Sequence, residues 1–249
     1  MTATTATTVV QGLWVEGELS AMEQLAVRSF LAQGHEVHVY SYERDLALPA
    51  GARRMEAAEV LPASAIFRYT AGPGAGSLAA FSNLFRYKLL HERGGWWTDL
   101  DMVCLRPLDF AAEHVFASER RKLGGVTVTN SLLKAPAGSP LTAELYERAL
   151  RHEQRATVWG STGPALVREV LERHGAERFM VPPDVFCPVD WWQAETLRQP
   201  GEIPDGAHAV HLWHEKWRSN GWPKDPGYPP AVLYQQLHRR YPAPDERRQ

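Results

Sequence analysis

The fold class follows from residues 9–42, which read VVQGLWVEGELSAMEQLAVRSFLAQGHEVHVYSY. Residues 9–15 form an apolar run suited to a buried strand, and residues 36–42 alternate apolar and polar side chains as a second strand does. Between them, Ser20 and Glu23 have the spacing of a capping box, and apolar residues then recur at helical spacing until a glycine. A strand, a helix and a strand in this order predict a right-handed crossover and a mostly parallel sheet. We therefore expect an α/β fold of the nucleotide-binding, Rossmann-like type.

Trp14 stands where the first of these strands ends. Ligands of such sheets bind at the carboxyl ends of the strands, so the segment 14–17 is well placed to touch a nucleotide. Trp14 could stack on a base, or it could be an ordinary core residue, and the segment taken alone supports both interpretations.

A second helix is predicted between Ser77, a good N-cap, and the pair Gly94-Gly95. Arg86 lies beside the apolar face of this helix, flanked by bulky apolar residues, where an unpaired guanidinium is unfavourable. It must meet either a buried carboxylate or a ligand phosphate, and on its own the structural ion pair is the more common case. The glycines at 72–76 lack the spacing and the lysine of a phosphate-binding loop, so we interpret them as a turn or hinge.

The strongest local signal follows the double glycine and reads Trp96-Trp97-Thr98-Asp99-Leu100-Asp101-Met102-Val103-Cys104-Leu105. In an extended segment residues two apart face the same way, so Trp97, Asp99 and Asp101 are expected on one face. Two carboxylates in an apolar setting need a compensating cation, and Mg²⁺ or Mn²⁺ is the natural oxygen-liganded partner. Such an ion could hold a diphosphate. The alternative is a pair of solvated aspartates, because a bare Asp-x-Asp is common by chance.

With its surroundings, this segment resembles one family. Residues 81–90 (FSNLFRYKLL) and 94–101 (GGWWTDLD) are similar to the DXD-containing sugar-binding region of family 32 glycosyltransferases. The resemblance implies a GT-A fold, a nucleoside-diphosphate-sugar donor (UDP in most relatives), a divalent metal ion and retention of anomeric configuration. Weaker similarities extend from residue 9 to about residue 217, through Leu13-Trp14-Val15, Thr129-Asn130-Ser131, Thr162-Gly163-Pro164 and His211-Leu212-Trp213.

The resemblance also implies roles for single residues. Asp101 would bind the metal ion, and Asp99 would contact the donor ribose or metal-bound water. Arg86 would contact the donor phosphate or sugar, completing the catalytic set, and Trp97 would lie beside the donor. The family commonly has an aspartate that binds donor-sugar hydroxyls where this chain has Asn83. An amide can both donate and accept hydrogen bonds, so this difference bears on which sugar is bound.

Two residues further along are candidates for donor binding. Asn130 lies in a strand predicted over residues 126–134, where a buried amide needs partners. The resemblance places it by the donor sugar. Gly163 belongs to a predicted helix entry, and its small size would let the backbone approach a ligand closely. For both residues the sequence supports an ordinary structural role equally well.

The C-terminal third offers His211 as a third metal ligand. His214 is the competing histidine, and a structural histidine is the alternative for either one. Trp213 and Trp217 could form a platform for an acceptor, because flat ring faces suit the C–H surfaces of sugars, or they could belong to the core.

The composition limits the other functions. A chain of 249 residues with 44% hydrophobic residues and no Gly/Ser-rich linker predicts one domain over residues 1–249, with disordered tails at residues 1–8 and about 242–249. A net charge of −2 leaves no electrostatic footprint for nucleic acid. Two distant cysteines favour a reducing compartment. The sequence shows no signal-peptide pattern and no transmembrane run, so we expect a cytoplasmic protein with at most peripheral membrane association.

These observations predict a metal-dependent retaining glycosyltransferase that moves a hexose from a UDP-sugar type of donor to a hydroxyl of a saccharide or other acceptor. One rival is a metal-dependent phosphohydrolase acting on nucleotide or sugar phosphates, although Met102-Val103 follow Asp101 where that class would carry Thr or Gly-Thr. The other rival is a carbohydrate-binding module, which would bind a donor without turning it over.

Overall fold

The strands form two sheets. The computed structural model describes residues 8–72, 74–153 and 160–243. The strands of the larger sheet are β1 (Val9–Trp14), β2 (Glu36–Ser41), β3 (Arg53–Glu56), β4 (Gly95–Thr98), β6 (Val115–Arg120) and β7 (Val126–Ala135), while β5 (Met102–Cys104) and β8 (Ala209–His211) form the smaller one.

The larger sheet has the strand order β3-β2-β1-β4-β7-β6. The first four strands of that order pair in parallel, whereas β7 is antiparallel to both β4 and β6. The predicted α/β fold with a mostly parallel central sheet is confirmed. The predicted opening is also confirmed, since β1 and β2 are joined by α1 (Ala21–Ala32), where the Glu23 carboxylate accepts a hydrogen bond from the Ser20 N–H at 2.8 Å.

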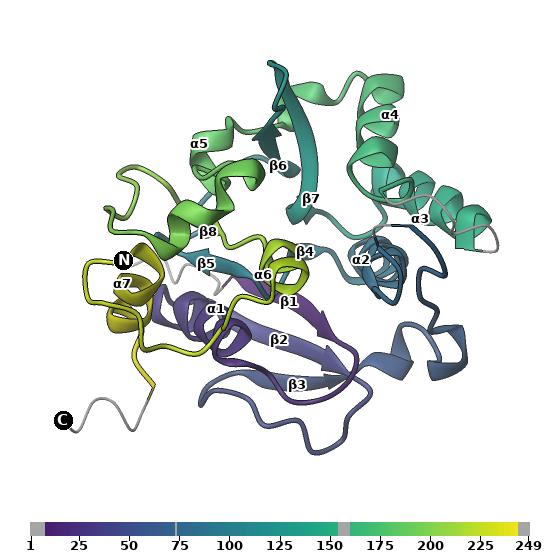
Figure 1. Ribbon diagram of the computed structural model, residues 1–249. Coiled ribbons are helices and arrows are strands. Elements are labelled where there is room, and N and C mark those ends of the chain that lie inside the picture. The colour runs from purple at the N-terminus through teal and green to yellow at the C-terminus, as the bar shows by residue number, and fades with distance from the viewer. Residues whose placement is uncertain (1–7, 73, 154–159, 244–249) are drawn as a thin grey trace, which may run out of the picture.

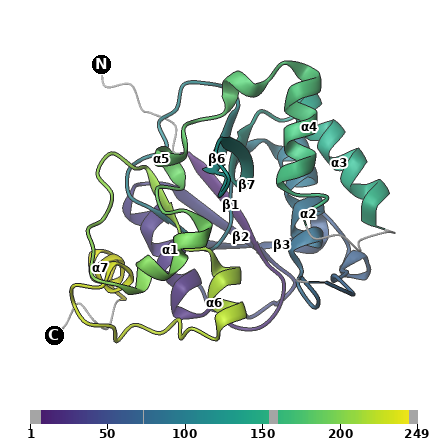
Figure 2. The same cartoon turned by 45° about the horizontal axis from the view of Figure 1, so that its top comes forward.

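Helices cover both faces of the central sheet (Figures 1 and 2). In both views α2, α3 and α4 lie together on one side, and α1, α6 and α7 lie on the other. The α-helices after α1 are α2 (Ala79–Arg93), α3 (Pro140–Glu153), α4 (Pro164–His174), α5 (Pro183–Phe186), α6 (His214–Asn220) and α7 (Leu233–Arg240). Short 3₁₀ helices are η1 (Ala57–Glu59), η2 (Ala63–Ala65), η3 (Glu177–Phe179) and η4 (Trp191–Arg198).

The alternation of side chains along β4 divides the apolar core. Trp97 packs with Phe85 in the cluster on the α2 side of the sheet, whereas Trp96 packs with Phe30 in the cluster on the α1 side. A third cluster lies around Trp217, between the small sheet and the C-terminal helices. Each face of the sheet is therefore closed by its own apolar layer, which leaves the strand ends for polar residues.

The double glycine turns the chain directly from α2 into β4. Gly94 has φ of +65°, and a Cβ at this position would lie 2.5 Å from the Ala137 nitrogen, so a side chain does not fit. The predicted end of the helix is confirmed. Its start differs slightly, because Ser77 lies outside the helix and its hydroxyl accepts from the Ala79 N–H at 3.2 Å.

Residues 99–101, here called the DXD turn, are not extended as the sequence predicted. β4 ends at Thr98, and the Met102 N–H donates to the Asp99 carbonyl at 3.2 Å, which closes a turn between the two sheets. The side chain of Leu100 packs against Gly12 of β1, where a Cβ would approach it to 2.9 Å.

Tertiary hydrogen bonds explain the turn. The Asp99 N–H donates to the Ser131 carbonyl at 2.7 Å on β7, and the Asp101 carbonyl accepts from the Leu212 N–H at 2.9 Å after β8. The two ends of the turn are thus attached to different sheets. An extended segment could not form both hydrogen bonds.

The ends of the chain are only partly described. Of the predicted tails, residues 1–7 and 244–249 lie outside the described residues, whereas Thr8 is described and its carbonyl accepts from the Glu36 N–H at 3.1 Å. Within the described ranges, no helix has both the length and the apolar character that crossing a membrane requires.

Candidate active site

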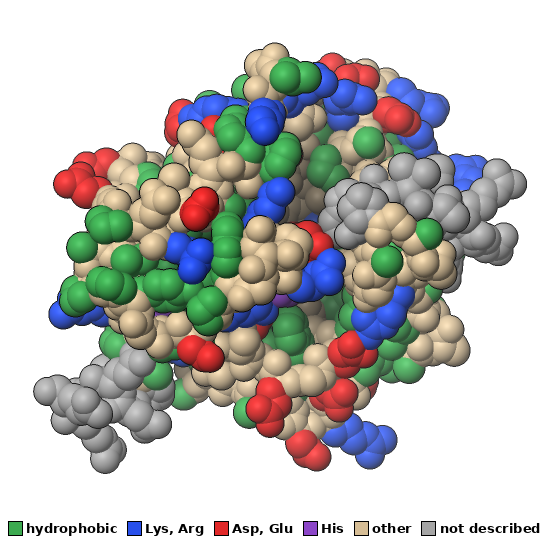
Figure 3. All heavy atoms as spheres, in the orientation of Figure 1, with side chains coloured by type: hydrophobic (Ala, Val, Ile, Leu, Met, Phe, Trp, Pro, Cys, Tyr) green, Lys and Arg blue, Asp and Glu red, His purple; other side chains and the backbone are tan. Residues whose placement is uncertain are grey.

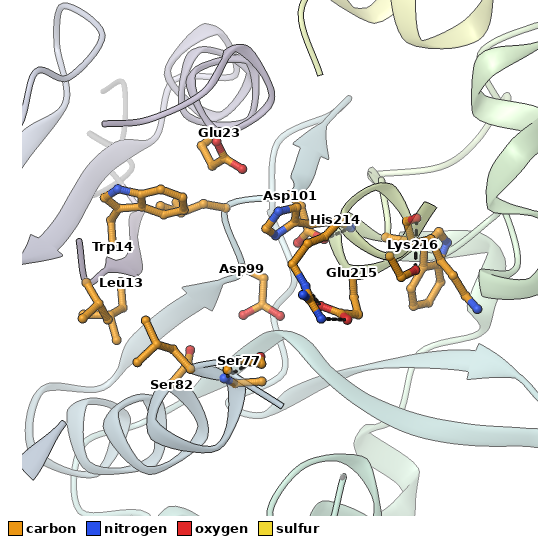
Figure 4. A pocket seen from close by; sticks show the side chains of 18 of the residues that line it. Leu13, Trp14, Glu23, Ser77, Ser82, Asp99, Asp101, His214, Glu215 and Lys216 are labelled. Carbon is orange, nitrogen blue, oxygen red and sulfur yellow. Dashed lines mark hydrogen bonds and ion pairs between the residues drawn. The ribbon is translucent and has the colours of Figure 1, made fainter. Parts of the chain in front are cut away.

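A cavity of about 970 Å³ opens beside the DXD turn, at the carboxyl ends of β1 and β4. Its volume is in the range of small-molecule sites. One wall comes from residues 13–16 and 75–79, the floor from Arg86 and the DXD turn, and the opposite wall from residues 213–216, and Glu119 and Trp191 also line the cavity. Figure 4 shows Asp99 in the middle, with Trp14 on one side and His214 and Lys216 on the other. In the space-filling view of Figure 3, charged side chains lie around the hollow near the centre of the face shown.

Asp99 is held by two donors from the α2 side. Arg86 Nη2 lies 2.8 Å from Asp99 Oδ1, and the indole N–H of Trp97 donates to the same oxygen at 2.9 Å. The side chain of Arg86 is 4% exposed and that of Asp99 is 29% exposed. The carboxylate therefore reaches the cavity, while the guanidinium that pairs with it is almost fully buried. Enclosure raises the pKa of Asp99, although the charge of Arg86 opposes this rise.

Asp101 faces the other way, toward the C-terminal part of the chain. Its Oδ2 accepts a hydrogen bond from the His214 N–H at 2.8 Å and lies 3.2 Å from His211 Nε2. Burial alone would raise the pKa of Asp101, but the charge and hydrogen bond of His211 outweigh it and hold this pKa below its usual value. Burial likewise opposes protonation of His211, but Asp101 holds the pKa of the ring well above its usual value.

The two candidate histidines therefore differ in role. His211 approaches Asp101 with its ring, whereas His214 bonds to Asp101 through its backbone and has its side chain on the cavity wall. Trp213 stands between them with φ of +58°, the one positive φ outside glycine among the described residues. Its ring lies 3.8 Å from that of His211, and its indole N–H donates to Val189 at 2.9 Å. These contacts hold a backbone conformation that non-glycine residues rarely adopt.

Asp101 and His211 fit two neighbouring ligands of one divalent ion. A carboxylate oxygen and an imidazole nitrogen are suitable donors. Octahedral bonds of ~2.1 Å place adjacent ligands about 3 Å apart, close to the observed 3.2 Å. Asp99, the third predicted ligand, has its Oδ1 paired with Arg86. In the described part of the chain, no three His, Cys, Asp or Glu side chains are already grouped as a metal site.

Three other predicted donor residues lie together behind Arg86. Asn83 and Asn130 are buried and hydrogen-bond to each other at 2.7 Å, and Asn83 also lies 3.1 Å from the Thr162 hydroxyl. A Cβ on Gly163 would lie 3.3 Å from the Asn83 amide, so this glycine closes the same cluster. The Asn130 carbonyl accepts a hydrogen bond from Arg86. The structure thus brings these residues together but does not place them on the wall of the cavity.

Two predicted contact residues are not at the cavity surface. Trp97 is 1% exposed and reaches the site through its hydrogen bond to Asp99. Trp217 is 0% exposed, and its indole N–H donates to the Leu212 carbonyl at 2.8 Å, so it is a core residue that offers no ring face to an acceptor. Trp14 and Trp213 line the cavity, and their proposed contacts with nucleotide and acceptor stay predictions.

Ser82, Glu119 and Trp191 are among the residues of the cavity wall that sequence reasoning missed. Ser82 accepts a hydrogen bond from Arg86 Nη2 at 3.2 Å, one turn earlier on α2. Glu119 directly precedes the basic run of residues 120–122, as a solvated residue would, and Trp191 belongs to no motif. The sequence could have indicated only Ser82, because it lies four residues before Arg86 and therefore on the same face of the predicted helix.

Comparisons with known proteins found similar solved structures but no similar curated sequence. Among solved structures, the chain is similar to the PaToxG glycosyltransferase, with 12% identity and a TM-score of 0.50 over 93% of this chain and 86% of the other. It is also similar to a mutant transferase (12% identity, TM-score 0.44, 68% and 86% covered) and to the catalytic domain of alpha-toxin from Clostridium novyi (9%, 0.40, 69% and 64%). No curated protein sequence matches significantly.

The family comparison concerns the segment that builds the floor of the cavity. Residues 63–121 match the family described as "Glycosyltransferase sugar-binding region containing DXD motif". This span includes α2, Arg86 and one Asp-x-Asp, at residues 99–101. The matched segment therefore includes the DXD turn at the floor of the cavity, and this match supports a glycosyltransferase.

Proposed function

We propose that this protein is a metal-dependent, retaining glycosyltransferase that transfers a hexose from a UDP-sugar to a hydroxyl of a saccharide or other acceptor. The observation that carries the proposal is the division of the DXD turn between two partners. Asp99 pairs with Arg86 on one side of the cavity floor, and Asp101 pairs with His211 on the other. The carboxylate of Asp99 is thus fixed by the charge of Arg86. The carboxylate of Asp101 lies beside the imidazole nitrogen of His211, and the two groups can bind the same cation.

The wall formed by residues 13–16 and 75–79 is suited to the nucleoside of the donor. Trp14 offers an aromatic ring at the carboxyl end of β1, and its indole N–H donates to the Gly17 carbonyl at 2.8 Å, which fixes the ring orientation. A base stacked there would direct its diphosphate toward the floor, where Arg86 adds positive charge.

Asp101 and His211 would hold the divalent ion, Mn²⁺ or Mg²⁺. Such an ion, when bound, neutralises charge that develops on the leaving diphosphate. His211 can act as a ligand only as a neutral ring. Metal binding must therefore displace the proton on His211, which the negative charge of Asp101 stabilises. Asp99, oriented by Arg86 and Trp97, is available for the donor ribose or for a water molecule.

Transfer consists of departure of the nucleoside diphosphate and attack by the acceptor hydroxyl on the anomeric carbon. The acceptor proton passes to the leaving phosphate oxygen, so this route requires no protein base. The choice of UDP and of retention rests on the resemblance of residues 81–101 to family 32 glycosyltransferases.

The proposal is tested by incubating purified protein with UDP-, GDP- and dTDP-sugars, with Mn²⁺ or with EDTA. We expect UDP release from at least one UDP-sugar that depends on Mn²⁺, and a rise in melting temperature with UDP and Mn²⁺ together. Release of phosphate from simple monoesters would indicate the phosphohydrolase. A melting-temperature rise with no turnover across a broad set of acceptors would indicate a carbohydrate-binding module.

A further inference from the structure

Glu119 differs from the other carboxylates that line the cavity. No hydrogen bond or ion pair joins its carboxylate to another residue in the described parts of the chain. Each of the other five carboxylates has a protein partner: Glu16 with Arg68, Glu23 with Lys224, Asp99 with Arg86, Asp101 with His211, and Glu215 with Arg218.

The strand β6 directs Glu119 into the cavity. Its two neighbours are engaged elsewhere, since the Ser118 hydroxyl donates to the Val181 carbonyl at 2.5 Å and Arg120 pairs with Asp184 and Asp190. Side chains alternate along a strand, so these contacts leave Glu119 on the cavity side. The carboxylate is therefore held in place by backbone pairing and not by a side-chain partner.

The surroundings of Glu119 are unfavourable for a charge in the free protein. Burial raises the pKa of Glu119 to about 7, with His211 opposing and Asp190 adding to the rise. A partly enclosed polar group without a partner lowers stability, and such groups persist where a ligand completes their bonding.

Glu119 lies close enough to His211 for their charges to interact, and His211 pairs with Asp101 at one end of the DXD turn. Two aromatic residues of the cavity lie near these groups: the ring of Trp213 is 3.8 Å from that of His211, and the ring of Trp191 is 4.6 Å from Lys216 Nζ. Trp14 stands on the opposite side of Asp99 from His214 (Figure 4). A carboxylate that accepts from hydroxyl groups, next to aromatic rings that cover C–H faces, is the combination that binds a sugar.

We propose that Glu119 binds a hydroxyl group of a saccharide acceptor and positions it across the DXD turn from the donor nucleoside. This inference rests on the proposed function, because it assigns the second substrate of the same cavity. Gln at this position would keep one acceptor oxygen but lose the charge, and Ala would remove both.

The test compares Glu119→Gln and Glu119→Ala with a matched control, Glu215→Gln, which changes another carboxylate of the same cavity. Glu215 is suited to this purpose because its carboxylate is already occupied by Arg218 at 2.6 and 2.9 Å. Two rates are measured with a UDP-sugar and Mn²⁺: UDP release to water, and transfer to a panel of methyl glycosides detected by mass spectrometry. Binding of the same glycosides in the presence of UDP is followed by thermal shift.

We expect Glu119→Gln to reduce transfer at least about tenfold more than it reduces hydrolysis, through a higher KM for the glycoside, and Glu119→Ala to reduce it further. Glu215→Gln should change the two rates equally. Equal losses of transfer and hydrolysis in Glu119→Gln would overturn the inference, as would a wild-type protein that hydrolyses donor but neither binds nor glycosylates any glycoside. A wild-type protein that releases no UDP contradicts the proposed function itself.

Discussion

The guanidinium of Arg86 donates to Asp99 Oδ1 at 2.8 Å and links helix α2 to the first carboxylate of the DXD turn. The sequence allowed either a structural ion pair or a contact with a ligand phosphate. The structure shows the ion pair, and because both residues also line the cavity the proposed donor would meet a positive charge that is already oriented.

Arg86→Gln should lower the free energy of unfolding by about 2 to 3 kcal/mol. Removal of one partner from a buried pair costs about 3–5 kcal/mol, and the 29% exposure of Asp99 reduces this value. Urea denaturation of Arg86→Gln, Asp99→Asn and the double variant measures the effect. The double variant should be more stable than the sum of the two single losses predicts. Strict additivity would show that the pair has no energetic coupling.

Asp101→Asn should reduce Mn²⁺-dependent sugar transfer by at least about a hundredfold, because an amide oxygen is a poor substitute for a charged ligand. The fold should persist, since the asparagine oxygen can still accept from the His214 N–H. A lost charge opposite His211 should still lower stability by about 1 to 2 kcal/mol. Asp109→Asn, at an exposed loop position, is the control. Full activity of Asp101→Asn would refute the assignment.

Trp97→Phe should lower kcat more than it raises the KM for donor. Phenylalanine keeps an aromatic ring against Arg86, whose guanidinium carbon lies 4.8 Å from the ring centre, but it removes the N–H that donates to Asp99. Loss of one hydrogen bond to a charged group predicts a decrease of about tenfold or more. Steady-state kinetics with varied donor separate the two parameters. A rise in KM at constant kcat would instead place Trp97 in direct contact with the donor.

His238 should make the protein sensitive to acid. Burial lowers the pKa of this ring to about 4, and its Nε2 has no hydrogen-bond partner among the described residues. The unfolded chain binds a proton near pH 6.5, so stability is retained above that pH and declines as the pH falls toward 4. The loss is at most about 3 kcal/mol.

The variant His238→Phe tests this pH dependence, because it keeps a ring beside Tyr234, 4.6 Å away, and cannot be protonated. Urea denaturation at pH 7.5 and 4.5 should show a smaller acid loss in the variant than in the wild type. The same loss in both proteins would exclude His238 as a source of acid sensitivity. Carboxylates elsewhere titrate in both proteins and cancel in this comparison.

Local pattern was sufficient where a feature depends on neighbouring residues. The strand, helix and strand of residues 9–42, the end of α2 at Gly94 and the need of Arg86 for a partner are all consequences of periodicity, backbone conformation and desolvation within a short stretch. The DXD motif was also evident in the sequence, but its shape was not. The turn forms because Ser131 and Leu212 bond to its two ends.

The sequence by itself determined the fold class and the acidic centre of the site. The tertiary structure alone decided which side chains meet there: His211 joins Asp101 across 110 residues, Glu119 enters the cavity, and Trp97 and Trp217 turn inward. The physical reason is that a sequence pattern records which residues prefer burial or a given backbone conformation. Which distant groups complete each other's charges and hydrogen bonds depends on how the strands are ordered and how the layers pack.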